Sequence, residues 1–536
     1  MKGAGGRGQE AARAGLKKAQ QFVQSFSKDP PKQVLTSDIL ESLKRRGIPQ
    51  ASVDHWREVL PKLAKYGHLS QGNKISIYAS GDQAYSEMWR QIDNANERVW
   101  LSTYIFEHDV IGTKFLSKMA EAADRGCAVK LVYDHVGSLS LPPSELSELS
   151  KTGAEIIPYN VVTWWFTWRT QFLRNHQKIT LIDQNAAFCG GMNIGNEYCS
   201  KEVGGNGMFR DTHMKIVGPA LEDLEAVYVS SLYEARWHQL RRLSGTSYFR
   251  NKRLQVGKVA RQYNPFKNFS FPHYVPGKGW EARDIEHVFK VETSPVILAR
   301  HFFRYLKTFS DLFNPLFFGQ PEHFRQPQIS LNKSKTPLFE TPENRDTGSV
   351  VQVLASHTRK QRRIVQQALQ LAIKSSRTSC LVTTPYFFPP RKLRQALFSA
   401  AKNGSKVRII TAGNSDVKVM LHAARYIYHL FLSHGIEIYE MKSPILHSKT
   451  VTIDDVFVTV GSYNFDIFSE KNLEVNVATF DPDAAAALNN QFEVDLTHCK
   501  KITLDDLHET SYVERFKQWC CYKVCQAVSF TILARL

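Results

Sequence analysis

The 536-residue sequence contains no run of 18 or more apolar residues, although 43% of its residues are hydrophobic. A helix that crosses a bilayer needs about 20 such residues, so the sequence predicts no transmembrane helix. Acidic residues are scarce, since 51 Asp and Glu face 69 Lys and Arg and leave a net charge of +18. This excess favours a polyanionic partner, either nucleic acid or an anionic membrane surface.

The eight cysteines have neither the spacing of a zinc site nor that of a disulfide framework. Cys127, Cys189 and Cys380 lie in apolar runs typical of strands, and we expect them to be buried thiols. We therefore expect no metal and no cofactor, and a reducing compartment.

Two segments nearly lack acidic residues. Residues 1–27 carry five Lys or Arg against the single acid Glu10, with apolar residues at helical spacing. This pattern is typical of an organelle transit peptide, and a solvated amphipathic helix is the alternative. Residues 235–280 contain ten Lys or Arg and no acid. Such a run indicates either contact with an anionic surface or a solvated face.

From about residue 75, short β-rich runs alternate with helical patterns, which predicts an α/β fold. The same order recurs in the second half, so the chain contains an internal repeat of about 150 residues. We predict two repeats, each a mixed β-sheet flanked by helices, packed about a pseudo-twofold axis. The predicted segments are a basic tail (1–35), a small helical region (36–74), a first repeat (75–240), a basic insertion and linker (241–348), a second repeat (349–505) and a C-terminal amphipathic segment (506–536).

One motif occurs in both repeats with the same spacing. It consists of His-x-Lys, then four intervening residues and an Asp, then six intervening residues and Gly-Gly/Ser-x-Asn. The first copy comprises His176, Lys178, Asp183 and Gly190–Asn193, and the second comprises His447, Lys449, Asp454 and Gly461–Asn464. The second histidine follows the first by 271 positions. His-x-Lys alone is uninformative, but the duplicated pattern is highly specific.

The residue types fit phosphodiester chemistry. On a strand, residues i and i+2 face the same side, so each His and Lys can point together into one site between the repeats. Two ammonium groups can stabilise the charge that develops on phosphate oxygens. One imidazole can attack phosphorus to form a phosphohistidine while the other protonates the leaving alcohol.

Other residues complete the predicted site. Asn193 and Asn464 can donate hydrogen bonds to the phosphate. Asp211 and Glu474 follow the two motifs at comparable distances, and we expect them to orient the histidines. Asp183 and Asp454 belong to the catalytic motif, and we expect them to support the fold around the lysines rather than to act directly.

The paired motif resembles that of the phospholipase D superfamily. Its flanks, "RNHQKITLIDQNAAFCGGMNIGNEY", "FRDTHMKIVGPA" and "ILHSKTVTIDDVFVTVGSYNFDIFSEKNLEVNV", resemble those of the cardiolipin synthases in it. The likeness covers about 80–240 and 350–500. It implies transfer of a phosphatidyl group from one phosphatidylglycerol to an alcohol, typically a second phosphatidylglycerol, without a metal. The order common in two-motif relatives implies that His176 is the nucleophile and His447 the general acid.

The chain departs from this resemblance at two points. Bacterial members usually begin with transmembrane segments, whereas this sequence begins with the basic tail, and the insertion at 241–348 is not part of the common pattern. Three other activities remain open: phospholipase D hydrolysis with water as acceptor, nuclease activity, and non-catalytic binding of anionic lipid. The lipid-like flanks favour phospholipid over nucleic acid, and we expect no nucleic-acid partner.

Three segments predict peripheral attachment to a membrane that contains phosphatidylglycerol and other anionic phospholipids. They are the basic run at 236–278, the aromatic cluster Trp164–Trp168, and the C-terminal segment. The alternatives are a packed loop for the aromatic cluster and burial against the core for the C-terminal segment. Together with the transit-like tail, cardiolipin chemistry predicts the mitochondrial inner membrane.

Overall fold

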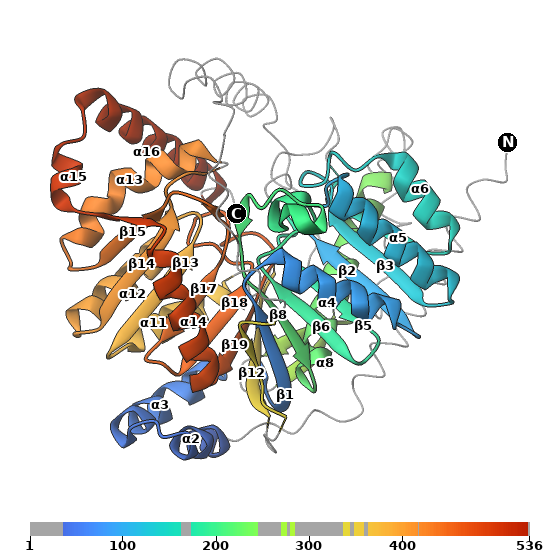
Figure 1. Cartoon of the computed structure of the whole chain (residues 1–536), viewed down its shortest axis with the longest axis horizontal. Helices are drawn as coiled ribbons and strands as arrows, with labels where there is room; N and C mark the ends of the chain where they lie inside the picture. The colour runs from blue at the N-terminus through green and yellow to red at the C-terminus, as the bar shows by residue number, and fades with distance from the viewer. Residues whose placement is uncertain are drawn as a thin grey trace.

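The computed structural model describes residues 36–161, 173–244, 270–275, 279–284, 336–343, 348–357, 363–415 and 417–533. Residues 1–35, the aromatic cluster Trp164–Trp168 and most of the insertion at 241–348 lie outside these ranges. Within them, one mixed sheet of 16 strands runs through the molecule, and helices cover it (Figure 1). The predicted α/β fold of two related repeats is confirmed.

The two halves of the sheet have the same strand order. In the first half this order is β1-β8-β6-β5-β2-β3-β4, and in the second it is β12-β19-β18-β17-β13-β14-β15. In both halves the last three strands are parallel, and the other neighbouring strands pair antiparallel. β1 and β12 pair antiparallel, so they join the half-sheets where the pseudo-twofold axis passes. The repeats therefore share one continuous sheet.

The strands of the first half are β1 (Leu69–Tyr78), β2 (Arg98–Thr103), β3 (Ala128–Asp134), β4 (Glu155–Tyr159), β5 (Ile179–Ile182), β6 (Ala186–Gly190) and β8 (His213–Val217). Those of the second half are β12 (Ser349–Ser356), β13 (Ser379–Thr384), β14 (Lys406–Ala412), β15 (Glu437–Met441), β17 (Thr450–Ile453), β18 (Phe457–Gly461) and β19 (Glu474–Phe480), extended by β20 (Cys499–Ile502). Short strands are β7 (Phe209–Arg210), β11 (Phe339–Glu340) and β16 (Ile445–Leu446), and β9 (Ser270–Val275) pairs with β10 (Gly279–Asp284).

The helices also correspond between the halves. Those of the first half are α4 (Gly81–Asp93), α5 (Val110–Asp124), α6 (Pro143–Lys151) and α8 (Ala220–Ser244). Those of the second half are α11 (Ile364–Ser375), α12 (Arg391–Lys402), α13 (Lys418–Leu432) and α14 (Pro482–Leu496), followed by α15 (Leu504–His508) and α16 (Tyr512–Leu533). Across the described ranges, none of the helices combines the length and the apolar character that a membrane span requires.

Local sequence explains where individual helices begin. Asp109 caps α5, where its carboxylate accepts a hydrogen bond from the Gly112 N–H at 2.8 Å. Asp481 caps α14 in the same way and also forms a 2.7 Å ion pair with Arg46. The helix-capping aspartates therefore fix where the chain leaves the sheet.

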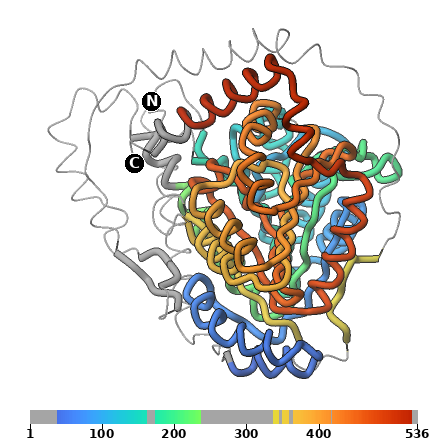
Figure 2. The backbone as a smooth tube through the Cα atoms, turned by 90° about the vertical axis from the view of Figure 1, so that its left-hand side faces the viewer, coloured from blue at the N-terminus to red at the C-terminus, as the bar shows by residue number. Residues whose placement is uncertain are grey.

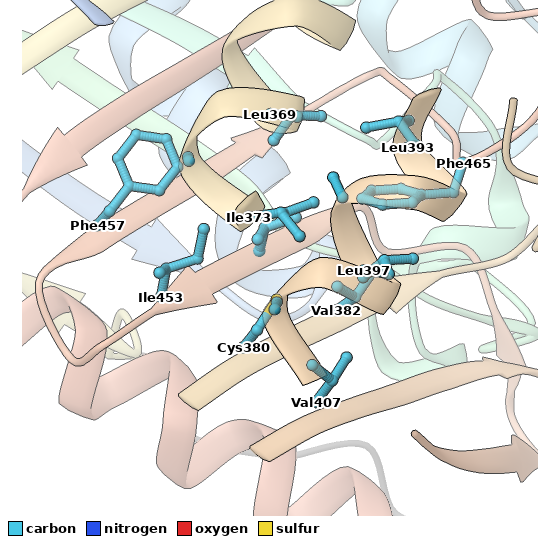
Figure 3. Close-up of a cluster of buried hydrophobic side chains, with 14 of the residues drawn as sticks. Leu369, Ile373, Cys380, Val382, Leu393, Leu397, Val407, Ile453, Phe457 and Phe465 are labelled. Atoms are coloured by element: carbon cyan, nitrogen blue, oxygen red, sulfur yellow. The ribbon is translucent and has the colours of Figure 1, made fainter. Parts of the chain in front are cut away.

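Apolar side chains from the sheet and its covering helices form the core of each half. In the second half, α11 and α12 place Leu369, Ile373 and Leu397 over Val382 and Ile453 of the sheet (Figure 3). The predicted burial of Cys127, Cys189 and Cys380 is confirmed. A dry core of this kind holds the sheet rigid, so the residues at its strand ends have fixed positions.

The N-terminal helices, α2 (Thr36–Arg45) and α3 (Gln50–Leu63), pack onto the second half rather than onto the first, which follows them in sequence. The Trp56 ring stacks on Phe457, with centroids 6.1 Å apart. The helical region was predicted to extend to residue 74, but β1 begins at Leu69. α2 and α3 therefore add to the core of the second repeat.

Candidate active site

The two motifs meet where short backbone contacts cross from one half to the other. The His176 N–H donates to the Leu473 carbonyl at 3.0 Å, and the Leu473 N–H donates to the Arg174 carbonyl at 2.9 Å. Across the pseudo-twofold axis, β16 pairs with β7, and the His447 N–H donates to the Arg210 carbonyl at 2.8 Å. Each motif histidine therefore follows a segment bound to the opposite half.

His176 shares a hydrogen bond with a carboxylate of the second half. Its Nδ1 lies 3.0 Å from Oε2 of Glu474, and the Ser462 hydroxyl donates to the same oxygen. Burial lowers the pKa of His176, and the neighbouring Glu474 opposes this effect without reversing it. With Nδ1–H donated to Glu474, the Nε2 atom of the neutral ring keeps its lone pair.

His447 has the reciprocal arrangement. Its Nδ1 lies 2.6 Å from Oδ2 of Asp211, which belongs to the first half. Burial would raise the pKa of Asp211, but the charges of Lys449 and His447 outweigh burial and lower it. The Thr212 N–H also donates to Asp211 at 2.7 Å. Asp211 is therefore an ionised acceptor that fixes the orientation of the His447 ring.

Both motif lysines are buried. The Nζ atom of Lys178 donates to the His176 carbonyl at 2.7 Å, and that of Lys449 lies 2.9 Å from Nδ1 of His447. Burial, and then the charge of Lys449, lower the pKa of Lys178 to about 7. The two ammonium groups repel each other because both are positively charged. A bound anion relieves this repulsion and is therefore strongly stabilised.

The chain is similar to known proteins over most of its length. The family model described as "Cardiolipin synthase, PLD-like domain" matches residues 88–212 and again 369–496. A cardiolipin synthase of Geobacillus thermodenitrificans is 26% identical over 451 residues, which are 84% of this chain and 71% of that protein. One of Clostridium perfringens is 27% identical over 448 residues, 83% of this chain and 75% of the relative.

By these matches the chain is similar to cardiolipin synthases of the phospholipase D type. Its fold is similar to that of a solved structure, the phosphatidylserine synthase of Haemophilus influenzae. That structure aligns with a TM-score of 0.50 over 85% of this chain and 94% of its own, at 14% identity. Each family-model match lies within one half of the molecule and contains one His-x-Lys motif.

The asparagines of the superfamily motif have different surroundings in the two halves. The Asn193 amide donates to the Tyr198 hydroxyl at 2.8 Å, and its Oδ1 accepts from the Ile105 N–H at 3.2 Å. Asn464 is buried, and its Oδ1 has no hydrogen-bond partner in the structure. Asn193 is thus largely occupied by protein groups, whereas Asn464 retains capacity for a ligand.

The aspartates of the superfamily motif lie at the far ends of the catalytic strands. Asp183 directly follows β5 and Lys178 directly precedes it, so the length of the strand separates the two residues. Its carboxylate accepts from the backbone N–H groups of Asn96, Glu97 and Arg98 at 2.8–3.1 Å. Burial would raise the pKa of Asp183, but these hydrogen bonds outweigh burial and lower it.

Asp454 makes the equivalent contacts in the second half, with the N–H groups of residues 377–379. Both aspartates have positive φ, 49° and 51°, as expected in a tight turn. The geometry agrees with the expectation that the aspartates support the fold. Neither carboxylate is near a motif histidine.

Sequence reasoning missed several groups in this phospholipase D-type site. The Tyr198 hydroxyl connects Asn193 to Nδ1 of His447, which is 3.4 Å away. His213 lies two residues after Asp211 and is buried, and burial lowers its pKa to about 4. The i, i+2 spacing of Asp211 and His213 was the available signal. Among the described residues, no three His, Cys, Asp or Glu side chains are grouped as metal ligands.

Tyr104 follows β2 and Tyr386 follows β13, and the two tyrosines have different surroundings. The Tyr104 ring lies 5.1 Å from that of His176, and Nζ of Lys178 lies 5.4 Å from its centroid. Tyr386 is partly buried against the core of the second half. Tyr104 therefore forms part of the wall of the site beside His176.

Proposed function

We propose that the protein is a phosphatidyltransferase that makes cardiolipin from two molecules of phosphatidylglycerol. The observation that supports this most directly is the reciprocal pairing of the histidines, His176 with Glu474 and His447 with Asp211. Two oriented imidazoles beside two buried lysines suit a reaction with two successive displacements at one phosphorus. The likeness to cardiolipin synthases over more than four fifths of the chain favours phospholipid substrates.

In the first displacement, Nε2 of His176 attacks the phosphorus of phosphatidylglycerol. The bond between phosphorus and the terminal glycerol oxygen breaks, and His447 gives that oxygen a proton. Glycerol leaves, and the phosphatidyl group stays on His176 as a phosphohistidine. Lys178 and Lys449 stabilise the charge on the non-bridging oxygens, and Asn464 adds a neutral donor.

In the second displacement, the neutral His447 takes the proton from a glycerol hydroxyl of a second phosphatidylglycerol. The resulting oxygen attacks the phosphohistidine, the P–N bond breaks, and cardiolipin leaves. His176 returns to its neutral form, while His447 holds the proton required for the next cycle. Glu474 and Asp211 keep each ring in the tautomer that these steps need.

Product analysis tests the proposal. The purified protein, incubated with phosphatidylglycerol vesicles, should release glycerol and form cardiolipin in equimolar amounts, as measured by mass spectrometry. A H176A/H447A double variant provides the inactive control. Phosphatidic acid as the main product would identify a hydrolase instead, and cleavage of a single-stranded oligonucleotide without lipid turnover would identify a nuclease.

Trapping the intermediate tests the assignment of roles. The H447N variant lacks the general acid and base, so it should form little product but accumulate a phosphatidyl group on His176. Acid-labile phosphate, mapped by mass spectrometry of peptides, locates it. A phosphohistidine on His447 in active enzyme would reverse the two roles.

We further propose that the protein attaches to its membrane from one side, and that residues 1–35 direct it to the mitochondrial inner membrane. The net charge of +18 favours an anionic surface, and the organelle rests on the composition of the tail alone, since the compared relatives are bacterial. Flotation with phosphatidylglycerol vesicles at rising salt tests the attachment. A fluorescent fusion of residues 1–35 that stays diffuse in the cytosol would rule out the organelle.

A further inference from the structure

A groove of about 800 Å³ lies between α12, α13, α16 and the loop that follows Asn464. None of its lining residues belongs to the paired motif. Its apolar lining includes Phe388, Pro389, Pro390, Ile427, Ile467 and Tyr522. A volume of this size accommodates a substantial ligand, and an apolar lining favours hydrocarbon.

The charged residues of the groove are almost all basic. Glu470 is the single carboxylate in the lining, and it lies 3.6 Å from Arg363 and accepts a hydrogen bond from Gln366 at 2.7 Å. The other charged lining residues are Arg391, Lys392, Arg394 and Lys523. None of these four forms an ion pair with another described residue. The groove therefore offers several uncompensated positive charges beside an apolar surface.

α16 carries an exposed aromatic face that leads to this groove. Phe516 and Trp519 are 59% and 40% exposed and their rings stack at 5.7 Å, and Tyr512 is also exposed. At 100° per residue, these three residues lie within about 80° of the groove residues Lys523 and Gln526. Stacked aromatics exposed on one helix face are typical of segments that rest in a membrane interface.

The opposite face of α16 anchors the helix to the second half. Cys525 lies 3.7 Å from the Met420 sulfur of α13, and the Tyr522 ring lies 4.6 Å from that of Tyr426. α16 is therefore held against the protein while its aromatic face remains outside. Figures 1 and 2 place α16 at the opposite end of the molecule from α2 and α3.

We propose that this groove binds one anionic phospholipid from the bilayer on which the aromatic face of α16 rests. The phosphate lies among Arg391, Arg394 and Lys523, and the acyl chains lie along the apolar lining. Charge complementarity selects anionic over zwitterionic lipid. This site is separate from the one at His176 and His447, so it does not depend on which reaction occurs there.

Photocrosslinking tests the site. The H176A/H447A protein is mixed with vesicles that contain phosphatidylglycerol with a diazirine in one acyl chain, and labelled peptides are mapped. We expect labels in the peptides that contain Phe388, Ile427 and Tyr522. Reversing two charges, R394E/K523E, should reduce this labelling more than 20-fold, since each basic residue near an anionic phosphate contributes about fivefold to binding.

The matched control, K44E/R45E, makes the same charge change at exposed positions of α2. It should leave the labelling of the groove unchanged. A second variant, A527W, adds bulk at an exposed lining residue without changing charge, and should also reduce labelling. Thermal unfolding shows whether each variant is folded.

Three outcomes would overturn the proposal. They are absence of label from the groove peptides, equal labelling by the phosphatidylcholine analogue, and displacement of the label by a single-stranded oligonucleotide but not by unlabelled phosphatidylglycerol. Cardiolipin formation by the wild-type protein is measured separately. Failure of the proposed reaction and failure of the groove therefore give different results.

Discussion

The Nδ1 atom of His176 lies 3.0 Å from the carboxylate of Glu474, a residue 298 positions later in the chain. The reciprocal pair joins His447 to Asp211 across 236 positions. Each imidazole is therefore oriented by a group from the other repeat, so the site depends on the register between the two half-sheets as well as on the motifs. Changes to the crossing carboxylates should affect chemistry more than folding.

Replacing either carboxylate by its amide should slow the reaction. In E474Q and D211N the partner ring loses its fixed tautomer and the stabilisation of its charged form, and we expect kcat to fall about 10³-fold. The fall in kcat caused by either amide variant should be much smaller when the partner histidine is already absent. A double-mutant cycle of E474Q with H176A, measured by cardiolipin formation, checks this coupling. Additive effects would show that Glu474 acts elsewhere.

The pH dependence of kcat/KM should be bell-shaped. Attack requires neutral His176, whose pKa is lowered by burial, so activity falls as pH decreases through a value below 6.5. The phosphate clamp requires protonated Lys178, so activity falls again above a pKa of about 7. In K178R the guanidinium stays charged. The activity that remains should therefore fall only at a higher pH on the alkaline side of the profile. An unchanged alkaline side would assign this fall to another group.

Lys178 should lower the stability of the folded protein while it serves the reaction. Its folded pKa of about 7 lies below the ordinary 10.5, so between these values the unfolded chain binds more protons and stability rises with pH. K178M removes this charge and should raise the melting temperature by a few degrees below pH 7, with a smaller gain toward pH 10. Activity should fall at least 10²-fold. An exposed control, K44M, should change neither quantity.

Asp183 should contribute to stability rather than to catalysis. D183A leaves three backbone N–H groups without their acceptor and places alanine at a positive φ, so we expect a loss of about 2 kcal/mol. D183N tolerates this conformation better and should be less damaging. Thermal unfolding gives the fraction of each variant that is folded. The kcat calculated per folded molecule should be near normal. A large fall in kcat would return Asp183 to the catalytic groups.

Gly191 should be required for the position of Asp211. A Cβ atom at residue 191 would lie 2.1 Å from Oδ1 of Asp211, so G191A must displace the carboxylate that orients His447. We expect a fall in kcat of about 10²-fold with a small change in melting temperature. Ser462 occupies the equivalent position, and its hydroxyl donates to Glu474 and accepts from the Val475 N–H, so S462G should lose these hydrogen bonds without displacing the carboxylate and cost about tenfold. Similar effects of both variants would contradict this explanation.

The sequence predicted the motif residues because their spacing repeats, and predicted the strands that end in "ITLI" and "TVTI" because they are short and apolar. It did not predict which carboxylate orients which histidine, since Asp211 and Glu474 follow their own motifs in sequence but cross in space. Tyr198 was missed because it joins the site through a 3₁₀ turn, Asn196–Tyr198, outside any periodic pattern. The association of α2 and α3 with the second repeat depends on packing partners more than 300 positions away, which local patterns do not encode.

The antiparallel pairing of β1 with β12 has a consequence for the origin of the chain. A single repeat contains one motif histidine and a carboxylate that binds the histidine of the other repeat. Alone it is chemically incomplete, and it could act only after association with a second copy. Such an ancestor would lose activity on dilution, because assembly of its site would follow mass action. A chain that carries both copies lacks that dependence, so its site is a property of one molecule at any concentration. The two halves also need not be identical: Ser462 stands where the first half has Gly191, and Glu474 orients a histidine as Asp211 does.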